Sequence, residues 1–311
     1  MKIIEPLQPN LTTLTASSLD ESTLPVWDSG TAYSVGDEVR IFSDGAYRTY
    51  EALIASTGED PTTDPVALEG DPSAGQPYWL ATGSTNRWAM FDGSVGSPSA
   101  DTTDIVVTYT PGTAINALAL FNVVGGTVNV TVASALAGGE IYNQTQKTLG
   151  DRGPGYWDFY FGGVSVRTRF QFFGIPFYPD MMITVTVAKA GGAEMAAIGE
   201  LVFGKEFVIG EDVLGMEPRI KDYSTNEFNA TFGYNVLVVR QTRRRLSITT
   251  MIDENRADTV FDKIQSLASQ KVVWIADKYA SGIIYGFYSD FIPAHNTYKV
   301  VQAQFKIEGL V

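Results

Sequence analysis

The residues best suited to ligand chemistry are aromatic side chains concentrated between positions 27 and 79. Sugar rings present apolar faces, so exposed Tyr or Trp rings framed by polar groups commonly bind them. Six such rings occur in this short segment: Trp27, Tyr33, Tyr47, Tyr50, Tyr78 and Trp79. Some of them must build a core, so the pattern leaves two alternatives open, a sugar-binding module and a purely structural spacer.

A second aromatic concentration follows the Gly-Pro-Gly sequence at 153–155. Tyr156 and Trp157 are predicted to lie in a loop, and strand alternation predicts that Phe159 and Phe161 point into a core. Loops at one end of a β-sandwich often carry ligand sites, which makes Tyr156 and Trp157 further candidates for sugar binding. Structural packing is the interpretation we favour for this run.

The sequence contains no recognisable set of catalytic residues. The chain has no cysteine and one histidine, His295, in a predicted loop, whereas a nucleophilic triad needs a nucleophile, a base and an orienting group. The 35 acidic residues could supply a glycosidase pair, but none stands out, and Asp37 with Glu38 reads as a turn. Three loop acids lack the spacing of a calcium loop: Glu59, Asp60 and Asp64. We therefore expect a protein that is not an enzyme and holds no metal or cofactor.

The net charge of −13 argues against nucleic-acid binding, because phosphate recognition needs an excess of Lys and Arg. The apolar run at 114–124 is interrupted by Asn116 and Asn122 and is too short to span a bilayer, so no membrane insertion is expected. The first residues lack the cationic and apolar regions of a secretory signal. These features predict a protein that is soluble before assembly.

Four arginines stand out in this acidic chain: Arg240, Arg243, Arg244 and Arg245. On a strand, Arg243 and Arg245 would share one face and Arg244 would take the other. Guanidinium groups pair with carboxylates through two hydrogen bonds, and Arg and Tyr are frequent interface anchors. We therefore interpret Tyr223, Arg240, Arg243 and Arg245 as candidates for an assembly interface, through intersubunit or interdomain ion pairs.

The chain is predicted to be mainly β, because runs rich in Val, Ile, Thr, Tyr and Phe alternate with Gly, Pro, Asn and Asp. Strands are expected at 38–43, 46–54, 77–81, 104–109, 117–121, 127–132, 164–170, 182–187, 198–204, 235–241, 244–252, 272–276, 283–292 and 298–309. One helix is expected after Asp253, which is suited to cap it, with Ala257, Val260, Phe261, Ile264 and Leu267 at helical spacing. Four prolines, at 61, 65, 72 and 77, predict a long irregular loop.

Four segments follow from these patterns. Residues 1–24 read as an extended arm docked on its own chain or on a neighbouring subunit, and deleting them is expected to leave the domains folded but weaken assembly. Residues 25–95 form a small β module with its junction, 96–204 a β-sandwich, and 205–311 an α+β assembly domain. The absence of cysteine means that packing or assembly must stabilise all of them.

The first module resembles chitin/cellulose-type carbohydrate-binding modules. The resemblance lies in Trp27, the stretch 32–39, Tyr47, Tyr50 and the pair Tyr78-Trp79. In such modules the tryptophans at the positions of Trp27 and Trp79 help build the fold. The resemblance therefore leaves Tyr33, Tyr47 and Tyr78 as the carbohydrate-binding candidates.

The whole chain resembles tail-associated structural proteins of tailed bacteriophages and prophages, and the junction Asn86-Arg87-Trp88-Ala89-Met90-Phe91-Asp92-Gly93 carries part of that resemblance. The sandwich is similar to discoidin-like or galactose-binding-like jelly rolls. The resemblance implies a virion part in the tail or baseplate that is assembled in the host cytoplasm, with itself as a trimer or hexamer and with other tail proteins. It further implies a role in host-surface glycan binding or in fibre attachment. The alternative is a non-catalytic carbohydrate-binding accessory protein of a polysaccharide-degrading system.

Overall fold

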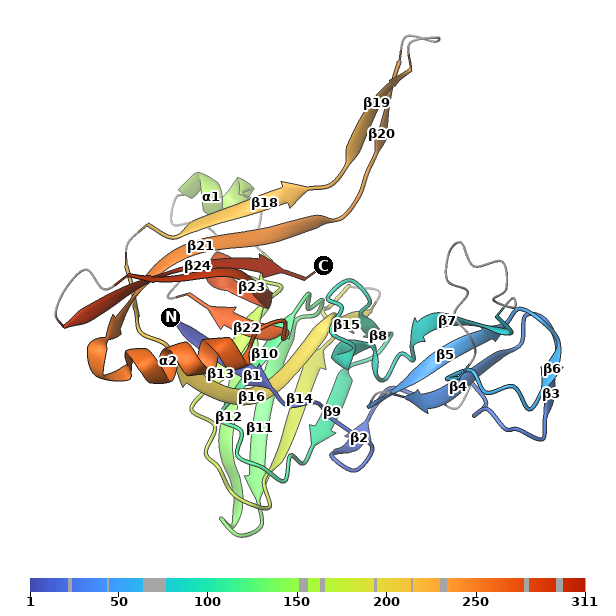
Figure 1. Ribbon diagram of the computed structural model, residues 1–311. Helices are drawn as coiled ribbons and strands as arrows, with labels where there is room; N and C mark the ends of the chain where they lie inside the picture. Colours follow the sequence, from blue (N-terminus) through green and yellow to red (C-terminus); the bar gives the residue numbers. More distant parts are fainter. Residues whose placement is uncertain are drawn as a thin grey trace.

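The computed structural model describes residues 1–21, 24–43, 45–63, 77–150, 156–162, 166–192, 195–213, 215–229, 234–276, 280–294 and 299–310. The chain is mainly β, as predicted, with a small N-terminal module, a β-sandwich and a C-terminal α+β unit (Figure 1). His295 and most of the proline-rich loop, including Pro65 and Pro72, lie outside the described residues.

The N-terminal module contains a three-stranded antiparallel sheet and a short two-stranded pair. The sheet order is β4 (Glu38–Ser43), β5 (Ala46–Ala52) and β7 (Trp79–Ser84), and β3 (Ala32–Tyr33) pairs with β6 (Ser56–Thr57). The first two strands of the sheet confirm the predictions at 38–43 and 46–54. Gly45, between them, has φ +83°, a left-handed conformation that glycine adopts without strain.

The sandwich places a five-stranded sheet against part of a larger one. The five strands are β12 (Gly139–Lys147), β11 (Thr127–Ser134), β14 (Met182–Ala188), β9 (Ile105–Tyr109) and β2 (Leu14–Ser17). Facing them are β13 (Phe170–Phe173), β10 (Ala117–Phe121) and β16 (Glu200–Val208). Alternate residues of both layers fill the core between them, which confirms the predicted sandwich. A small pair, β8 (Ser99–Asp101) with β15 (Ala196–Ile198), follows the 3-10 turn η1 (Ala89–Phe91).

The first strand, β1 (Lys2–Pro6), joins the sandwich to the C-terminal unit. It pairs with β16 on one side and β22 on the other, inside a ten-stranded sheet of order β13-β10-β16-β1-β22-β23-β24-β21-β17, in which β18 also pairs with β21. Residues 1–24, which were predicted to be an extended segment without periodicity, therefore contain a central strand of the large sheet. Ile3 and Ile4 are both fully buried, one on each face, so the strand lacks the apolar-polar alternation by which it could have been recognised.

The C-terminal unit supplies the rest of the large sheet and one helix. Its elements are β17 (Glu211–Asp212), β18 (Glu217–Asp222), β21 (Thr242–Asp253), α2 (Glu254–Ser266), β22 (Val272–Ile275), η2 (Ala280–Gly282), β23 (Ile283–Ala294) and β24 (Val300–Gly309). The predicted cap of α2 is confirmed, because the Asp253 carboxylate accepts a hydrogen bond from the Asn255 N–H. Val260 and Ile264 are buried, whereas Phe261 is largely exposed.

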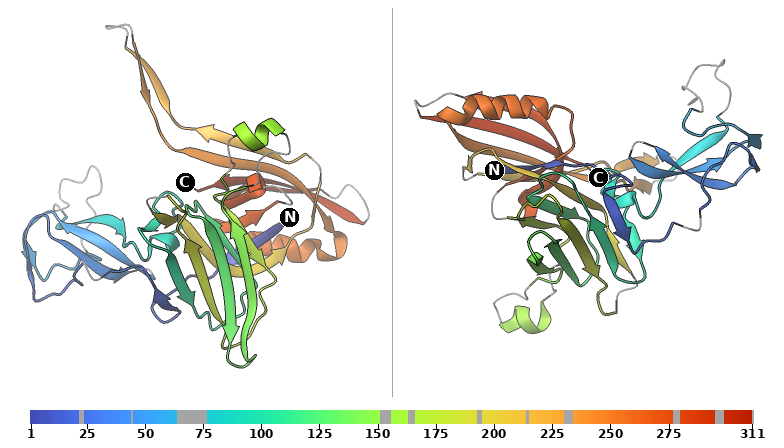
Figure 2. Two further views of the ribbon diagram at one scale, coloured as in Figure 1. Left: turned by 180° about the vertical axis from the view of Figure 1, so that it is seen from behind. Right: turned by 90° about the horizontal axis from the view of Figure 1, so that it is seen from below.

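The large sheet curls about β1. Phe203 and Phe207 lie on the same face of β16. Phe203 packs into the sandwich core, and Phe207 packs against the core beneath α2, here called the α2 core. The five-stranded sheet and α2 therefore cover the same face of the large sheet (Figures 1 and 2). On the opposite face, Phe121 of β10 stacks on Tyr285 of β23 at 5.7 Å although four inter-strand steps separate them in the sheet. Arg169 Nη1 also donates to the Ile283 carbonyl at 2.7 Å. The sandwich and the C-terminal unit therefore share one continuous, folded sheet.

Two predictions in the middle of the chain were wrong. The strand expected at 164–170 begins only at Phe170, with an isolated bridge between Leu149 and Val166 before it, and residues 163–165 lie outside the described part. The expected aromatic loop at 156–157 is the start of a short helix, α1 (Tyr156–Phe161). Strand β12 was not predicted, because its residues are mostly polar and exposed.

Candidate functional site

A two-stranded ribbon projects from the C-terminal unit (Figure 1). The pairing of β21 with β24 ends at Arg245 and Glu308, whereas β21 continues beside β18 as far as Thr242 and Asp222. Beyond them β19 (Thr225–Asn229) pairs only with β20 (Tyr234–Val238). The strand predicted at 235–241 corresponds to β20, one of the two outer strands of this ribbon, which ends at Val238. The whole ribbon, residues 217–245, is here called the arm.

The arm exposes apolar side chains on both of its faces. Ile220 is 72% exposed and Val239 78%, and Leu237 and Val238, which point to opposite faces, are also exposed. A two-stranded ribbon alone is marginally stable in water, because it has no second layer to bury its side chains. The arm therefore presents apolar surface that no described residue covers.

The structure divides the predicted interface residues into two groups. Tyr223, Arg240 and Arg243 meet at the bend of the arm, where the Arg243 guanidinium lies 5.5 Å from the Tyr223 ring and the Arg240 N–H donates to Ser224 Oγ at 3.0 Å. Arg245 instead lies at the base of the arm, where the pairing with β24 ends, and it pairs with Glu308 of its own chain at 2.8 Å. Arg244 and Arg240 are exposed.

The arm differs from the rest of the chain in charge. Residues 217–245 hold six basic and three acidic residues, a formal charge of +3, which leaves −16 for the remainder of a chain whose total is −13. A basic projection on an acidic body favours contact with acidic surfaces, including those of other copies.

The three aromatic candidates of the N-terminal module are packed rather than exposed. Tyr33 is 8% exposed and meets Trp79 edge-on at 5.2 Å, and Tyr78 is partly buried against the same core. Tyr47 packs toward Trp88 of the junction at 6.5 Å, with the Arg40 guanidinium 5.2 Å from its ring. The structure does not bring these three tyrosines together into one platform.

Tyr156 and Trp157, in contrast, are freely exposed on α1. Trp157 is 70% exposed, and its ring lies 4.8 Å from that of Phe161, which is itself 73% exposed. The prediction that Phe161 points into the core is therefore wrong, because residues four apart share one face of a helix and no described residue covers this face. Figure 2 shows α1 standing away from the body of the sandwich.

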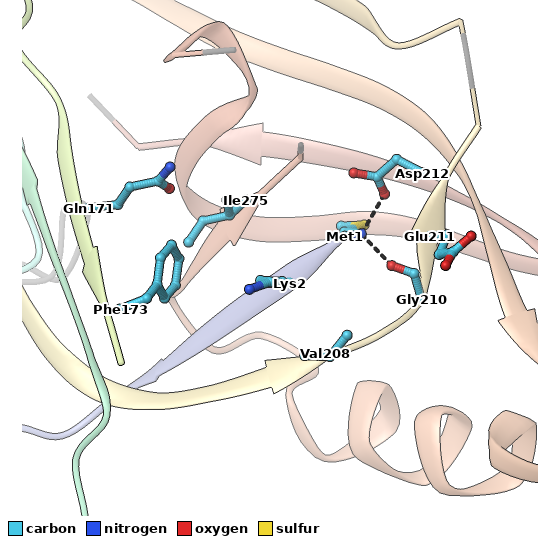
Figure 3. A pocket seen from close by; sticks show the side chains of 9 residues that line it. All are labelled: Met1, Lys2, Gln171, Phe173, Val208, Gly210, Glu211, Asp212 and Ile275. Carbon is cyan, nitrogen blue, oxygen red and sulfur yellow. Dashed lines mark hydrogen bonds and ion pairs between the residues drawn. The ribbon is translucent and has the colours of Figure 1, made fainter. Parts of the chain in front are cut away.

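A groove, here called the basal groove, lies where the curled sheet opens near the first residue (Figure 3). Its volume is about 490 Å³, and its lining residues are Met1, Lys2, Gln171, Phe173, Val208, Gly210, Glu211, Asp212 and Ile275. The Met1 amino group pairs with Asp212 at 2.7 Å, and Lys2 Nζ pairs with Glu206 at 2.6 Å and lies 4.8 Å from the Phe173 ring. No sequence pattern indicates this groove, because its lining residues come from four segments that are far apart in the chain.

A buried polar cluster connects the junction, the sandwich and the C-terminal unit. The Glu200 carboxylate is 2% exposed, accepts a hydrogen bond from the Gly93 N–H at 3.1 Å and is hydrogen-bonded to Tyr285. Burial, followed by the negative charge of Asp92, raises the pKa of Glu200 to about 8. Lys271 Nζ donates to the Gly93 carbonyl at 3.2 Å.

Within the described residues, no group of three or more His, Cys, Asp or Glu side chains has the arrangement of a metal site. None of the helices in this part of the chain combines the length and the apolar character needed to cross a membrane.

Comparisons with known proteins add little. No family model matches the chain, and no curated protein matches it. Among solved structures, a mutant of chitosan-binding module 1 from a chitosanase/glucanase of Paenibacillus sp. IK-5 is 12% identical, with 38% of this chain and 82% of that chain covered and a TM-score of 0.25. A likeness this low carries no argument about the function of this chain.

Proposed function

We propose that this protein is a non-enzymatic structural component of a phage tail or baseplate, which enters a symmetric assembly through its arm. The observation that carries the proposal is the exposure of apolar residues on both faces of a ribbon with no covering layer among the described residues. Burial of such side chains stabilises protein association, and their exposure in a free monomer favours it. The remaining units then serve as a rigid body that the arm attaches to its neighbours.

Replacing Leu237 and Val239 by Asp is expected to prevent assembly while leaving the body folded, because both side chains are exposed to solvent. Sedimentation velocity should show the variant as a monomer, and immunogold electron microscopy should find it missing from tail particles. The matched control is Leu136→Asp with Val35→Asp, two exposed aliphatic side chains far from the arm in sequence. Normal incorporation of the arm variant would refute the proposal.

A second candidate function is glycan binding, favoured by the exposed aromatic rings of α1. Stacking rings contribute binding energy beyond their buried area, so Tyr156→Ala with Trp157→Ala should weaken binding to an immobilised glycan at least about tenfold. A glycan array measures the effect, with Tyr33→Phe as the control, since that ring is buried in the module core. An array with no signal for the unaltered protein would remove this function.

A further inference from the structure

The basal groove has the chemistry of a receptor for basic and aliphatic side chains. Phe173, Val208 and Ile275 supply apolar walls, and the carboxylates of Glu211 and Asp212 lie at one side (Figure 3). A second cavity of about 400 Å³ lies beside it and shares Val208, Gly210 and Glu211 with its lining.

One polar atom of the groove lacks a partner. The side-chain oxygen of Gln171 is buried and accepts no hydrogen bond from any described residue. A buried acceptor without a donor costs free energy, and a donor in the groove would relieve this cost only if the Gln171 amide turned toward it. The position of Lys2, whose ammonium lies against the Phe173 ring and pairs with Glu206, shows that this region already accommodates cations.

The arm carries the complementary groups. Arg240 and Arg244 are exposed, and the aliphatic side chains of Leu237 and Val239 lie next to Arg240 in sequence. A guanidinium can pair with a carboxylate such as that of Glu211 through two hydrogen bonds. The charge of +3 on the arm against −16 on the rest of the chain adds a long-range attraction between the arm of one copy and the body of another.

The arm of the same chain is directed away from this groove. In Figure 1 and in the left view of Figure 2, the ribbon leaves the body on the side opposite to the first residue, which marks the groove. The groove and the arm of one chain are therefore different surfaces pointing in different directions. Such a pair of unlike surfaces is what a head-to-tail contact between copies requires.

We propose that the arm of one copy docks in the basal groove of a second copy, with Arg240 or Arg244 near Glu211 and the apolar residues against Val208 and Phe173. This inference rests on the proposed assembly function and specifies its partner surface. A repeated head-to-tail contact of this kind closes into a ring if its rotation permits and otherwise forms a helical filament.

The test uses two full-length charge variants in sedimentation velocity. Variant A, Arg240→Glu with Arg244→Glu, makes the arm acidic, and variant B, Glu211→Arg, makes the groove basic. Each variant alone should associate about tenfold more weakly or worse, because like charges then face each other. An equimolar mixture should recover association, since each arm then meets an oppositely charged groove of the other variant.

Matched controls carry the same charge changes elsewhere. Lys147→Glu with Lys189→Glu corresponds to variant A, and Glu38→Arg to variant B, and all three positions are exposed. Unaltered association of the controls and recovery in the mixture would support the docking. If variant A weakens association but variant B does not, or if the mixture stays dissociated, the arm binds another surface and the groove proposal is wrong. If the unaltered chain is monomeric yet present in tail particles, the assembly function stands and the second-copy partner is excluded.

Discussion

Replacing Glu200 by Gln is expected to stabilise the protein at pH 9 and to flatten its stability between pH 5 and 9. The pKa of Glu200 is raised from 4.5 to about 8 in the folded chain, chiefly because the carboxylate is buried. Between these two pH values the folded state holds a proton that the unfolded state has released, so the free energy of unfolding falls as pH rises. Below pH 4.5 both states are protonated and this loss is absent.

The size of the effect is large for one side chain. A shift of this extent corresponds to about 5 kcal/mol of stability lost by pH 9, since each pKa unit is worth about 1.4 kcal/mol. Glutamine retains an oxygen that accepts from the Gly93 N–H and an amide that bonds Tyr285, but it cannot ionise.

Urea unfolding at pH 5, 7 and 9 measures this difference directly. Glu38→Gln, at an exposed position, is the control and should follow the unaltered protein at every pH. Equal pH slopes for the Glu200 variant and the unaltered protein would contradict the assignment. Because Glu200 bonds the junction at Gly93 and the C-terminal unit at Tyr285, alkaline pH should loosen the contact among all three parts.

The sequence predicted most elements that have one buried and one solvated face. Strand β11 alternates buried and half-buried residues along its length, and α2 has a capping aspartate and an apolar stripe, so both could be placed from the pattern alone. The polar strand β12 and the doubly buried β1 carry no such alternation, and both were missed.

The functional surfaces were harder to predict than the elements. The returning side of the arm was predicted as strand, at 235–241 and from 244 onward, whereas β18 and β19 were not. Whether the ribbon lies on the body or leaves it depends on how far β24 pairs with β21, which only the register shows. Likewise, no local signal indicates that Tyr33 is buried while Trp157 is exposed, because both follow polar or Gly-rich residues. The aromatic composition identified candidate rings but not their burial.

Replacing Ile3 or Ile4 by Asp is expected to unfold both the sandwich and the C-terminal unit. Each side chain is fully buried, Ile3 in the α2 core and Ile4 on the opposite face of the sheet with Val202 and Ile275. An unpaired carboxylate in such a site costs several kcal/mol, in addition to the lost apolar burial, and total stability is only about 5–15 kcal/mol.

The effect should reach both units because β1 is the only strand between β16 and β22 in the described sheet. Calorimetry should show the temperature of the main unfolding transition lowered by at least about 10 °C, or the transition lost. Limited proteolysis should cut in both the sandwich and the C-terminal unit. The control is Leu11→Asp, an exposed leucine in the following turn, which should leave the transition unchanged. If either isoleucine variant kept the unaltered transition, β1 would not be the element through which the two units share their sheet, and the earlier expectation that the first 24 residues are dispensable for folding would hold.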